Sequence, residues 1–157
     1  MINIDDIDLK ILHSLQHDGR LSNAEIADRV ALSPSPCLRR LRRLEADKVI
    51  EGYRPQLNRQ AIGLGMTLFV QIKLHDHSAD SLAGFEQAIL AMPAVINAHT
   101  VSGSADYLLE VVAVDLADYD CWIRQVQVLP MVREIESNFA LRSVKSAAPL
   151  PLDQAKS

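Results

Sequence analysis

Hydrophobic residues recur every three or four positions in three stretches of the first 46 residues, a pattern typical of three amphipathic helices. The first helix is predicted to begin at Asp5 or Asp6 and to end before Asp18-Gly19. The second begins with a capping box, in which Glu25 follows Ser22 by three positions. The apolar positions that these two helices would bury are Ile7, Ile11, Leu15, Ile26, Ala27 and Val30.

The third helix is predicted over residues 33–45. Ser33 can cap it, and Pro34 suits its first position because that position needs no backbone N–H. Its apolar side chains fall on one face, and Ser35, Arg39, Arg42 and Arg43 fall on the opposite face with Arg40 at the edge. Three helices with a short connection between the last two predict a helix-turn-helix unit.

The pattern is lost after this unit. Residues 48–53 are predicted to form a turn and a short extended segment, which is a candidate small wing. The next stretch contains Pro55 and has no periodicity, and Gly63 and Gly65 complete a hinge. We therefore predict a winged helix-turn-helix domain at residues 1–53 and a linker at 54–65.

From Thr67 the hydrophobic period changes to two, which indicates a β-strand. Three further strands are predicted at residues 95–102, 106–114 and 133–144. Helices starting at Ser78 or Ser81 and at Asp115 separate them. The order β-α-β-β-α-β predicts a ferredoxin-like antiparallel sheet over residues 66–145 with both helices on one face, followed by a tail at 146–157. The fold class is therefore α+β.

The other face of this sheet has no cover of its own. The third strand has apolar side chains at both odd and even positions, so we predict a large apolar patch on that face. Such a patch favours burial against a second subunit, as in a homodimer.

Charge is distributed unevenly along the chain. The net charge is −4, but residues 19–59 carry nine basic and five acidic residues, whereas residues 61–157 carry six basic and eleven acidic residues. Guanidinium groups bind phosphate and guanine in bidentate geometry, so the four arginines of residues 39–43 favour contact with DNA. A solvated charged face is the alternative for such a run.

Other functions lack their sequence signals. No apolar run reaches membrane-spanning length and the N-terminus is acidic, which predicts a cytoplasmic protein with no membrane partner. Cys37 and Cys121 are far apart, and His75 and His77 have no third ligand nearby, so we expect no disulfide and no metal. We also expect no catalytic residue and no cofactor. Aromatic residues make up 4% of the chain, which disfavours RNA binding by stacking.

Two motif sets resemble a known family. The first set is Asp5-x-x-Asp8-x-x-Ile11-Leu12, Asp18-Gly19-Arg20-x-Ser22 and Leu32-Ser33-x-x-x-Cys37-x-x-Arg40-x-x-x-Leu44-Glu45. The second is Val101-Ser102-Gly103-x-x-Asp106-Tyr107-Leu108-Leu109. Together they resemble the Lrp/AsnC (feast/famine) transcriptional regulators of bacteria over nearly the whole chain, and the second set resembles the turn of their ligand-sensing (RAM-type) domain.

The resemblance implies a nucleoid-associated regulator that binds double-stranded DNA and senses a free amino acid. It also implies a homodimer that assembles further into a tetramer or octamer. Of the residues that would contact DNA, Ser35 and Arg39 are expected to read bases and the others to position the helix. The full set is Asn23, Ser33, Ser35, Arg39, Arg40, Arg43 and Arg54.

The expected effector site is the loop between the second and third strands, with residues Ser102, Gly103, Ser104, Asp106 and Tyr107. Gly103 lets backbone N–H groups approach a carboxylate, and Asp106 could pair with the effector's ammonium group. The alternative for Asp106 is a turn residue whose side chain bonds backbone N–H groups.

Two other functions stay open for this architecture. One is an enzyme similar to sirohaem decarboxylases, and the other is an architectural protein that wraps DNA without a ligand.

Overall fold

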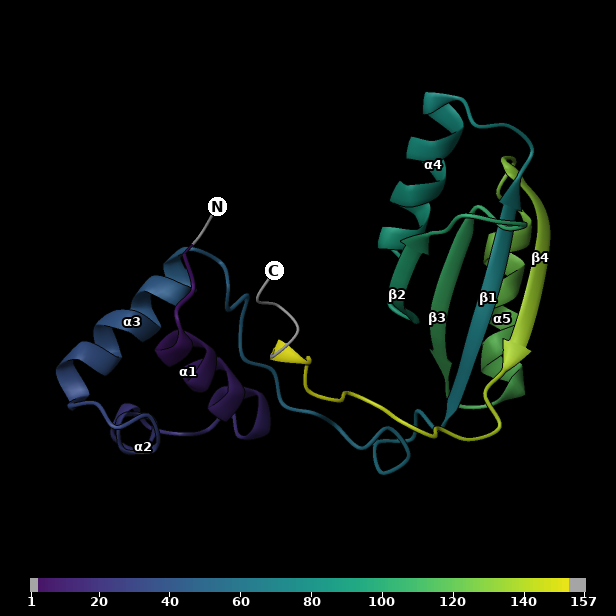
Figure 1. Cartoon of the computed structure of the whole chain (residues 1–157). Coiled ribbons are helices and arrows are strands. Elements are labelled where there is room, and N and C mark those ends of the chain that lie inside the picture. Colours follow the sequence, from purple (N-terminus) through teal and green to yellow (C-terminus); the bar gives the residue numbers. More distant parts are fainter. Residues whose placement is uncertain (1–2, 153–157) are drawn as a thin grey trace. The chain divides into compact units, whose positions relative to one another are not determined.

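The computed structural model describes residues 3–152, and it divides into two compact units (Figure 1). Within the described residues, the first unit runs to Gln56 and takes in residues 145–152, and the second is Leu57–Val144. The boundary between the units falls inside the predicted linker at 54–65, and residues 146–152 of the predicted tail group with the first unit. The predicted domain bounds stay a prediction. Residues 153–157 of that predicted tail lie outside the described residues.

The first unit contains α1 (Asp6–His17), α2 (Asn23–Arg29) and α3 (Pro34–Ala46). Both predicted N-terminal caps are confirmed: Asp5 accepts from the backbone N–H groups of α1, and Ser22 forms a reciprocal capping box with Glu25. The buried apolar residues of this unit are Ile11, Ile26, Ala27, Val30, Cys37 and Leu44.

The start of α3 differs in detail from the prediction. The helix begins at Pro34 with Ser33 at the cap, but the Ser33 side chain makes no capping hydrogen bond. Pro34 and Pro36 occupy the first and third helical positions and have no N–H, so only Ser35 could donate to a capping hydroxyl. The restricted backbone of proline therefore sets this helix start.

The segment after α3 contains no β-strand between residues 47 and 65, all of which the structure describes. It turns directly after the helix, where the N–H of Lys48 donates to the carbonyl of Glu45 at 3.1 Å, and it turns again over residues 59–63. The hydroxyl of Tyr53 donates to Glu45 at 3.0 Å and ties this segment to the end of α3. The predicted turn is thus present, and the predicted wing contains no β-strand.

The second unit has the predicted β-α-β-β-α-β order. Its elements are β1 (Met66–Leu74), α4 (Ala79–Leu90), β2 (Val95–Thr100), β3 (Tyr107–Ala113), α5 (Leu116–Gln127) and β4 (Val132–Phe139). The strands form one antiparallel sheet in the order β2-β3-β1-β4, which confirms the ferredoxin-like fold. β4 ends at Phe139, short of the predicted residue 144, because its partner β1 begins at Met66 and pairs Leu68 with Phe139.

Alternate residues of the central strands form the core of this unit. Leu68, Val70 and Ile72 of β1 are fully buried, and they share one core cluster with Phe85 of α4 and Trp122 of α5. Both helices therefore cover the same face of the sheet, as predicted.

The opposite face of the sheet is mixed, and the predicted large apolar patch is wrong. Leu108 pairs across the sheet with Gln71, and Phe69 pairs with Glu110. Glu110 also accepts a hydrogen bond from Arg59 at 2.9 Å. Ion pairs and amides therefore interrupt the apolar side chains on this face, and the homodimer stays a prediction.

Candidate functional site

The arginines of α3 separate into two groups. Arg40 contacts Asp5 at 2.6 Å and Asp8 at 3.0 Å, and Arg43 contacts the other oxygen of Asp8. Asp8 is fully buried, and it is the one buried charged residue in the described part of the chain. These four charged residues join the start of α1 to α3.

Asp5 and Asp8 also form hydrogen bonds with each other. The backbone N–H of Asp5 donates to Asp8 at 3.1 Å, and the N–H of Asp8 donates back to Asp5 at 2.9 Å. That backbone bond, followed by the side-chain bond from Arg40, holds the pKa of the Asp5 carboxyl below its ordinary value of 3.8. Asp5 and Asp8 therefore serve both as the helix cap and as the partners of two arginines.

Arg39 and Arg42 are exposed and make no ion pair within residues 3–152. With Ser35 they occupy positions i, i+4 and i+7 of α3, which places all three on one stripe of the helix. Ser33 is exposed just before this stripe. The stripe is the part of α3 whose cationic groups are available to another molecule.

The predicted DNA contacts thus divide into free groups and engaged groups. Arg40 and Arg43 are held by acids of the same chain, and Asn23 donates to the carbonyl of Pro34 at 2.9 Å, which ties α2 to the start of α3. Arg54 is exposed in the extended segment after α3. Arg42 was not among the predicted contacts, although its i+7 spacing from Ser35 is a signal that the sequence contains.

The loop between β2 and β3 has backbone donors available. The N–H of Val101 donates to the carbonyl of Asp106 at 3.0 Å and closes the loop. Between them, no N–H group of residues 102–105 donates a hydrogen bond in the described structure. Gly103 has φ +124°, in the left-handed region that favours glycine. These free donors suit an anion such as a carboxylate.

Both carboxylate oxygens of Asp106 are already engaged. One accepts from the N–H of Leu74 at 2.8 Å, and the other lies 2.8 Å from Nε2 of His77. The bond to His77 is the main reason that the pKa of Asp106 lies below its ordinary value of 3.8. This arrangement is that of the alternative interpretation, in which Asp106 is a turn residue, and each of its oxygens already has one intramolecular partner.

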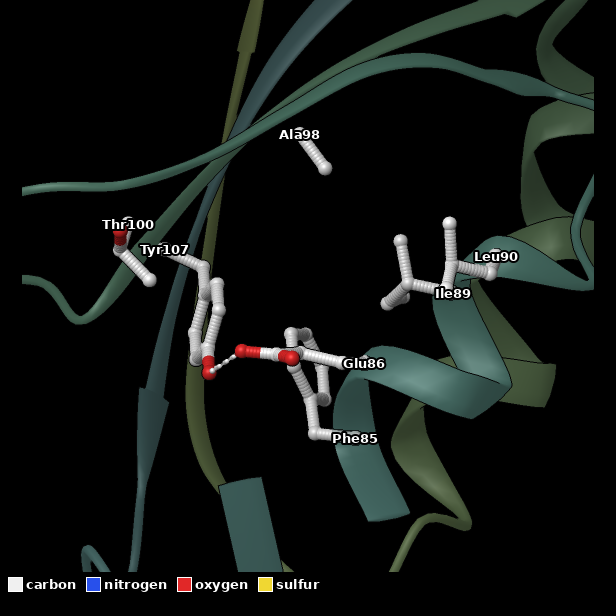
Figure 2. A pocket seen from close by; sticks show the side chains of 7 residues that line it. All are labelled: Phe85, Glu86, Ile89, Leu90, Ala98, Thr100 and Tyr107. Atoms are coloured by element: carbon white, nitrogen blue, oxygen red, sulfur yellow. Dashed lines mark hydrogen bonds between the residues drawn. The ribbon is translucent and has the colours of Figure 1, made fainter. Parts of the chain in front are cut away.

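Tyr107 faces the helices and borders a hollow of about 290 Å³ between α4 and β2 (Figure 2). Its hydroxyl donates to Oε1 of Glu86 at 3.0 Å, and its ring lies 4.6 Å from that of Phe85. Burial, with Glu86 second, raises the pKa of Tyr107 to about 12. Glu86 could not be predicted as a site residue, because its proximity to Tyr107 arises from the packing of α4 on the sheet.

Comparison with known proteins identifies both halves of the chain. Residues 4–51 match the winged helix-turn-helix DNA-binding family, and residues 67–150 match the Lrp/AsnC ligand binding domain. The chain belongs to the Lrp/AsnC family.

Individual relatives cover nearly all of this Lrp/AsnC chain. A Bkd operon transcriptional regulator of Pseudomonas aeruginosa is 43% identical over 96% of this chain and 100% of its own length. A leucine-responsive regulatory protein of Rhizobium meliloti is 40% identical over 93% of this chain and 94% of its own. Among solved structures, a transcriptional regulator of Neisseria meningitidis in complex with L-Met has a TM-score of 0.93 and 32% identity, covering 98% of this chain and 99% of that one.

Two further properties of the described residues are relevant to this Lrp/AsnC chain. None of its described helices is both long and apolar enough to cross a membrane. Within residues 3–152, no group of three or more His, Cys, Asp or Glu side chains is arranged to hold a metal ion.

Proposed function

We propose that this Lrp/AsnC protein is a transcriptional regulator that binds double-stranded DNA through α3 and responds to a free amino acid. The observation that carries the proposal is the stripe of Ser35, Arg39 and Arg42, whose arginines are exposed and unpaired in the described structure. The relatives are named as regulators, and they include a leucine-responsive protein. That kinship supports a function other than catalysis.

The two groups of arginines have different tasks in this proposal. Asp8 fixes Arg40 and Arg43, which hold α3 against α1 in one orientation. Ser35 and Arg39 then contact base edges in the major groove, and Arg42 contacts a phosphate. Arg40 and Arg43 act as positioning residues.

The effector loop is proposed to bind the carboxylate of the amino acid. The N–H groups of residues 102–105 supply donors, and Gly103 lets the ligand approach the backbone. The Neisseria meningitidis relative was solved with L-Met, which supports an amino acid as ligand. By linkage, the effector changes DNA affinity only as far as it binds two states of the protein differently.

We further propose that the protein is a cytoplasmic, nucleoid-associated homodimer that assembles into tetramers or octamers. Leu57, Ile62 and Leu141 of the second unit are 60%, 53% and 98% exposed, so this unit presents apolar side chains that a second copy could cover. Sedimentation of the full chain at micromolar concentration tests this assembly, and a monodisperse monomer would contradict it.

DNA binding is tested by fluorescence anisotropy with a duplex selected from a random pool by the protein itself. Arg39→Ala should reduce discrimination between the selected and a scrambled duplex by about 1–3 kcal/mol. Arg42→Ala should weaken both duplexes equally and reduce the slope of log affinity against log salt by about one. Arg124→Ala is the matched control, because this exposed arginine lies on α5 and pairs with Asp120.

Unchanged affinity and unchanged salt slope in both α3 variants would refute the assignment of this stripe.

The architectural alternative is tested separately by thermal shift against a panel of free amino acids. A bound ligand raises the unfolding temperature by mass action, so flat curves for every amino acid would favour an architectural protein.

A further inference from the structure

The hollow beside α4 and β2 has an apolar wall and one charged group. Its lining consists of Phe85, Glu86, Ile89, Leu90, Ala98, Thr100 and Tyr107. Glu86 is the one carboxyl side chain among these residues, and none of them is basic. Such a hollow favours a cationic group attached to a hydrocarbon.

The Glu86 carboxylate is oriented but not saturated. Oε1 accepts from the Tyr107 hydroxyl at 3.0 Å, and the Tyr107 ring packs on Phe85. Figure 2 shows the Glu86 side chain reaching from α4 to that hydroxyl. Its second oxygen, Oε2, accepts no hydrogen bond from any described residue. A positioned carboxylate with a free oxygen is a suitable partner for an ammonium group.

The hollow ends where the effector loop begins. Thr100 and Tyr107 both line it, and they form the β2–β3 pair next to the loop. The loop then supplies the free N–H groups of residues 102–105. This part of the fold thus combines a carboxylate, backbone N–H groups that can bind an anion, and an apolar wall. An aliphatic α-amino acid requires these three features for its ammonium group, its carboxylate and its side chain.

We infer that Glu86 binds the ammonium group of the effector and that the apolar wall of the hollow binds its side chain. The inference rests on the proposed amino-acid sensing. It places the ammonium group at Glu86 instead of Asp106, because each oxygen of Asp106 already has an intramolecular partner whereas Oε2 of Glu86 has none among the described residues. It also specifies the effector class: the side chain is aliphatic, since an acidic side chain would enter an apolar hollow beside Glu86 with no cation to meet it.

The test is calorimetric titration of the full chain with four probes: L-leucine, L-methionine, L-glutamate and 4-methylpentanoate, which is leucine without its amino group. L-leucine or L-methionine should bind at least about tenfold more tightly than the other two probes. Glu86→Gln keeps an acceptor for the Tyr107 hydroxyl but removes the charge. It should weaken the binding of L-leucine at least about fivefold and leave the binding of 4-methylpentanoate unchanged. A general loss of order in the site would weaken both. Asp80→Asn, on α4 but outside the hollow, should change neither.

A second variant tests the wall without touching the acid. Ala98→Phe fills the hollow from an exposed position of β2. It should weaken the binding of L-leucine more than the binding of L-alanine. Unchanged leucine binding in both variants, or a preference for glutamate, would overturn the inference and leave amino-acid sensing intact. If the unmodified protein binds no amino acid, sensing and the inference both fail, whereas DNA binding is judged independently by anisotropy.

Discussion

Replacing the buried Asp8 should destabilise the DNA-binding unit and leave the sensing unit unchanged. Asp8 accepts hydrogen bonds from the Asp5 N–H, Arg40 and Arg43, and bonds to charged groups each contribute about 1.5–3 kcal/mol when shielded from water. The two arginine side chains are 25% and 43% exposed, so water compensates for part of the loss. We therefore expect Asp8→Ala to lower the local stability of the unit by about 2–4 kcal/mol.

Hydrogen exchange followed by mass spectrometry measures this loss unit by unit. A decrease of about 2–4 kcal/mol corresponds to an increase of about 30- to 700-fold in the exchange of α1 and α3 amides that open together. Peptides from β1 and β3 should keep their rates and serve as the internal reference. Asp8→Asn separates charge from shape, and Asp28→Asn, an exposed acid on α2, is the control variant.

Exchange rates of α1 and α3 within about threefold of the unmodified protein would refute the reasoning, because the ion pairs would then contribute almost nothing to stability. In that case Arg40 and Arg43 would be free to bind phosphate, and the division of the α3 arginines would need revision.

Two further predictions concern other contacts. The side-chain amide of Gln16 forms hydrogen bonds with both the N–H and the carbonyl of Leu150. Gln16→Ala should therefore increase the hydrogen-exchange rate of the Leu150 amide by about three- to tenfold. An unchanged rate would show that this contact does not hold the C-terminal segment. The lowered pKa of Asp106 means that its contribution to stability is present above pH 3.8 and is lost as the pH falls through the folded-state pKa. His77→Gln removes the main cause of that shift, so acid unfolding of the sensing unit, followed by the fluorescence of Trp122, should begin at a higher pH; an unchanged acid midpoint would contradict this.

Much of the fold follows from local sequence. The capping box of Ser22 and Glu25 needs only residues three apart, and the alternation of Leu68, Val70 and Ile72 needs only a strand with one face on a core. These signals act within one turn of helix or one strand. The helix-turn-helix unit, the ferredoxin-like order of elements and the family resemblance could therefore be predicted.

The site depends on contacts between distant parts of the chain. Asp8 lies 32 residues before Arg40, His77 lies 29 residues before Asp106, and Glu86 lies 21 residues before Tyr107. Helical periodicity places Arg42 and Arg43 on the same exposed side, but it does not indicate that Arg43 forms an ion pair with the buried Asp8. Sequence alone determined which elements form, because caps and periodicity are local; tertiary packing decided which charged groups are engaged and which are free, because their partners come from other elements.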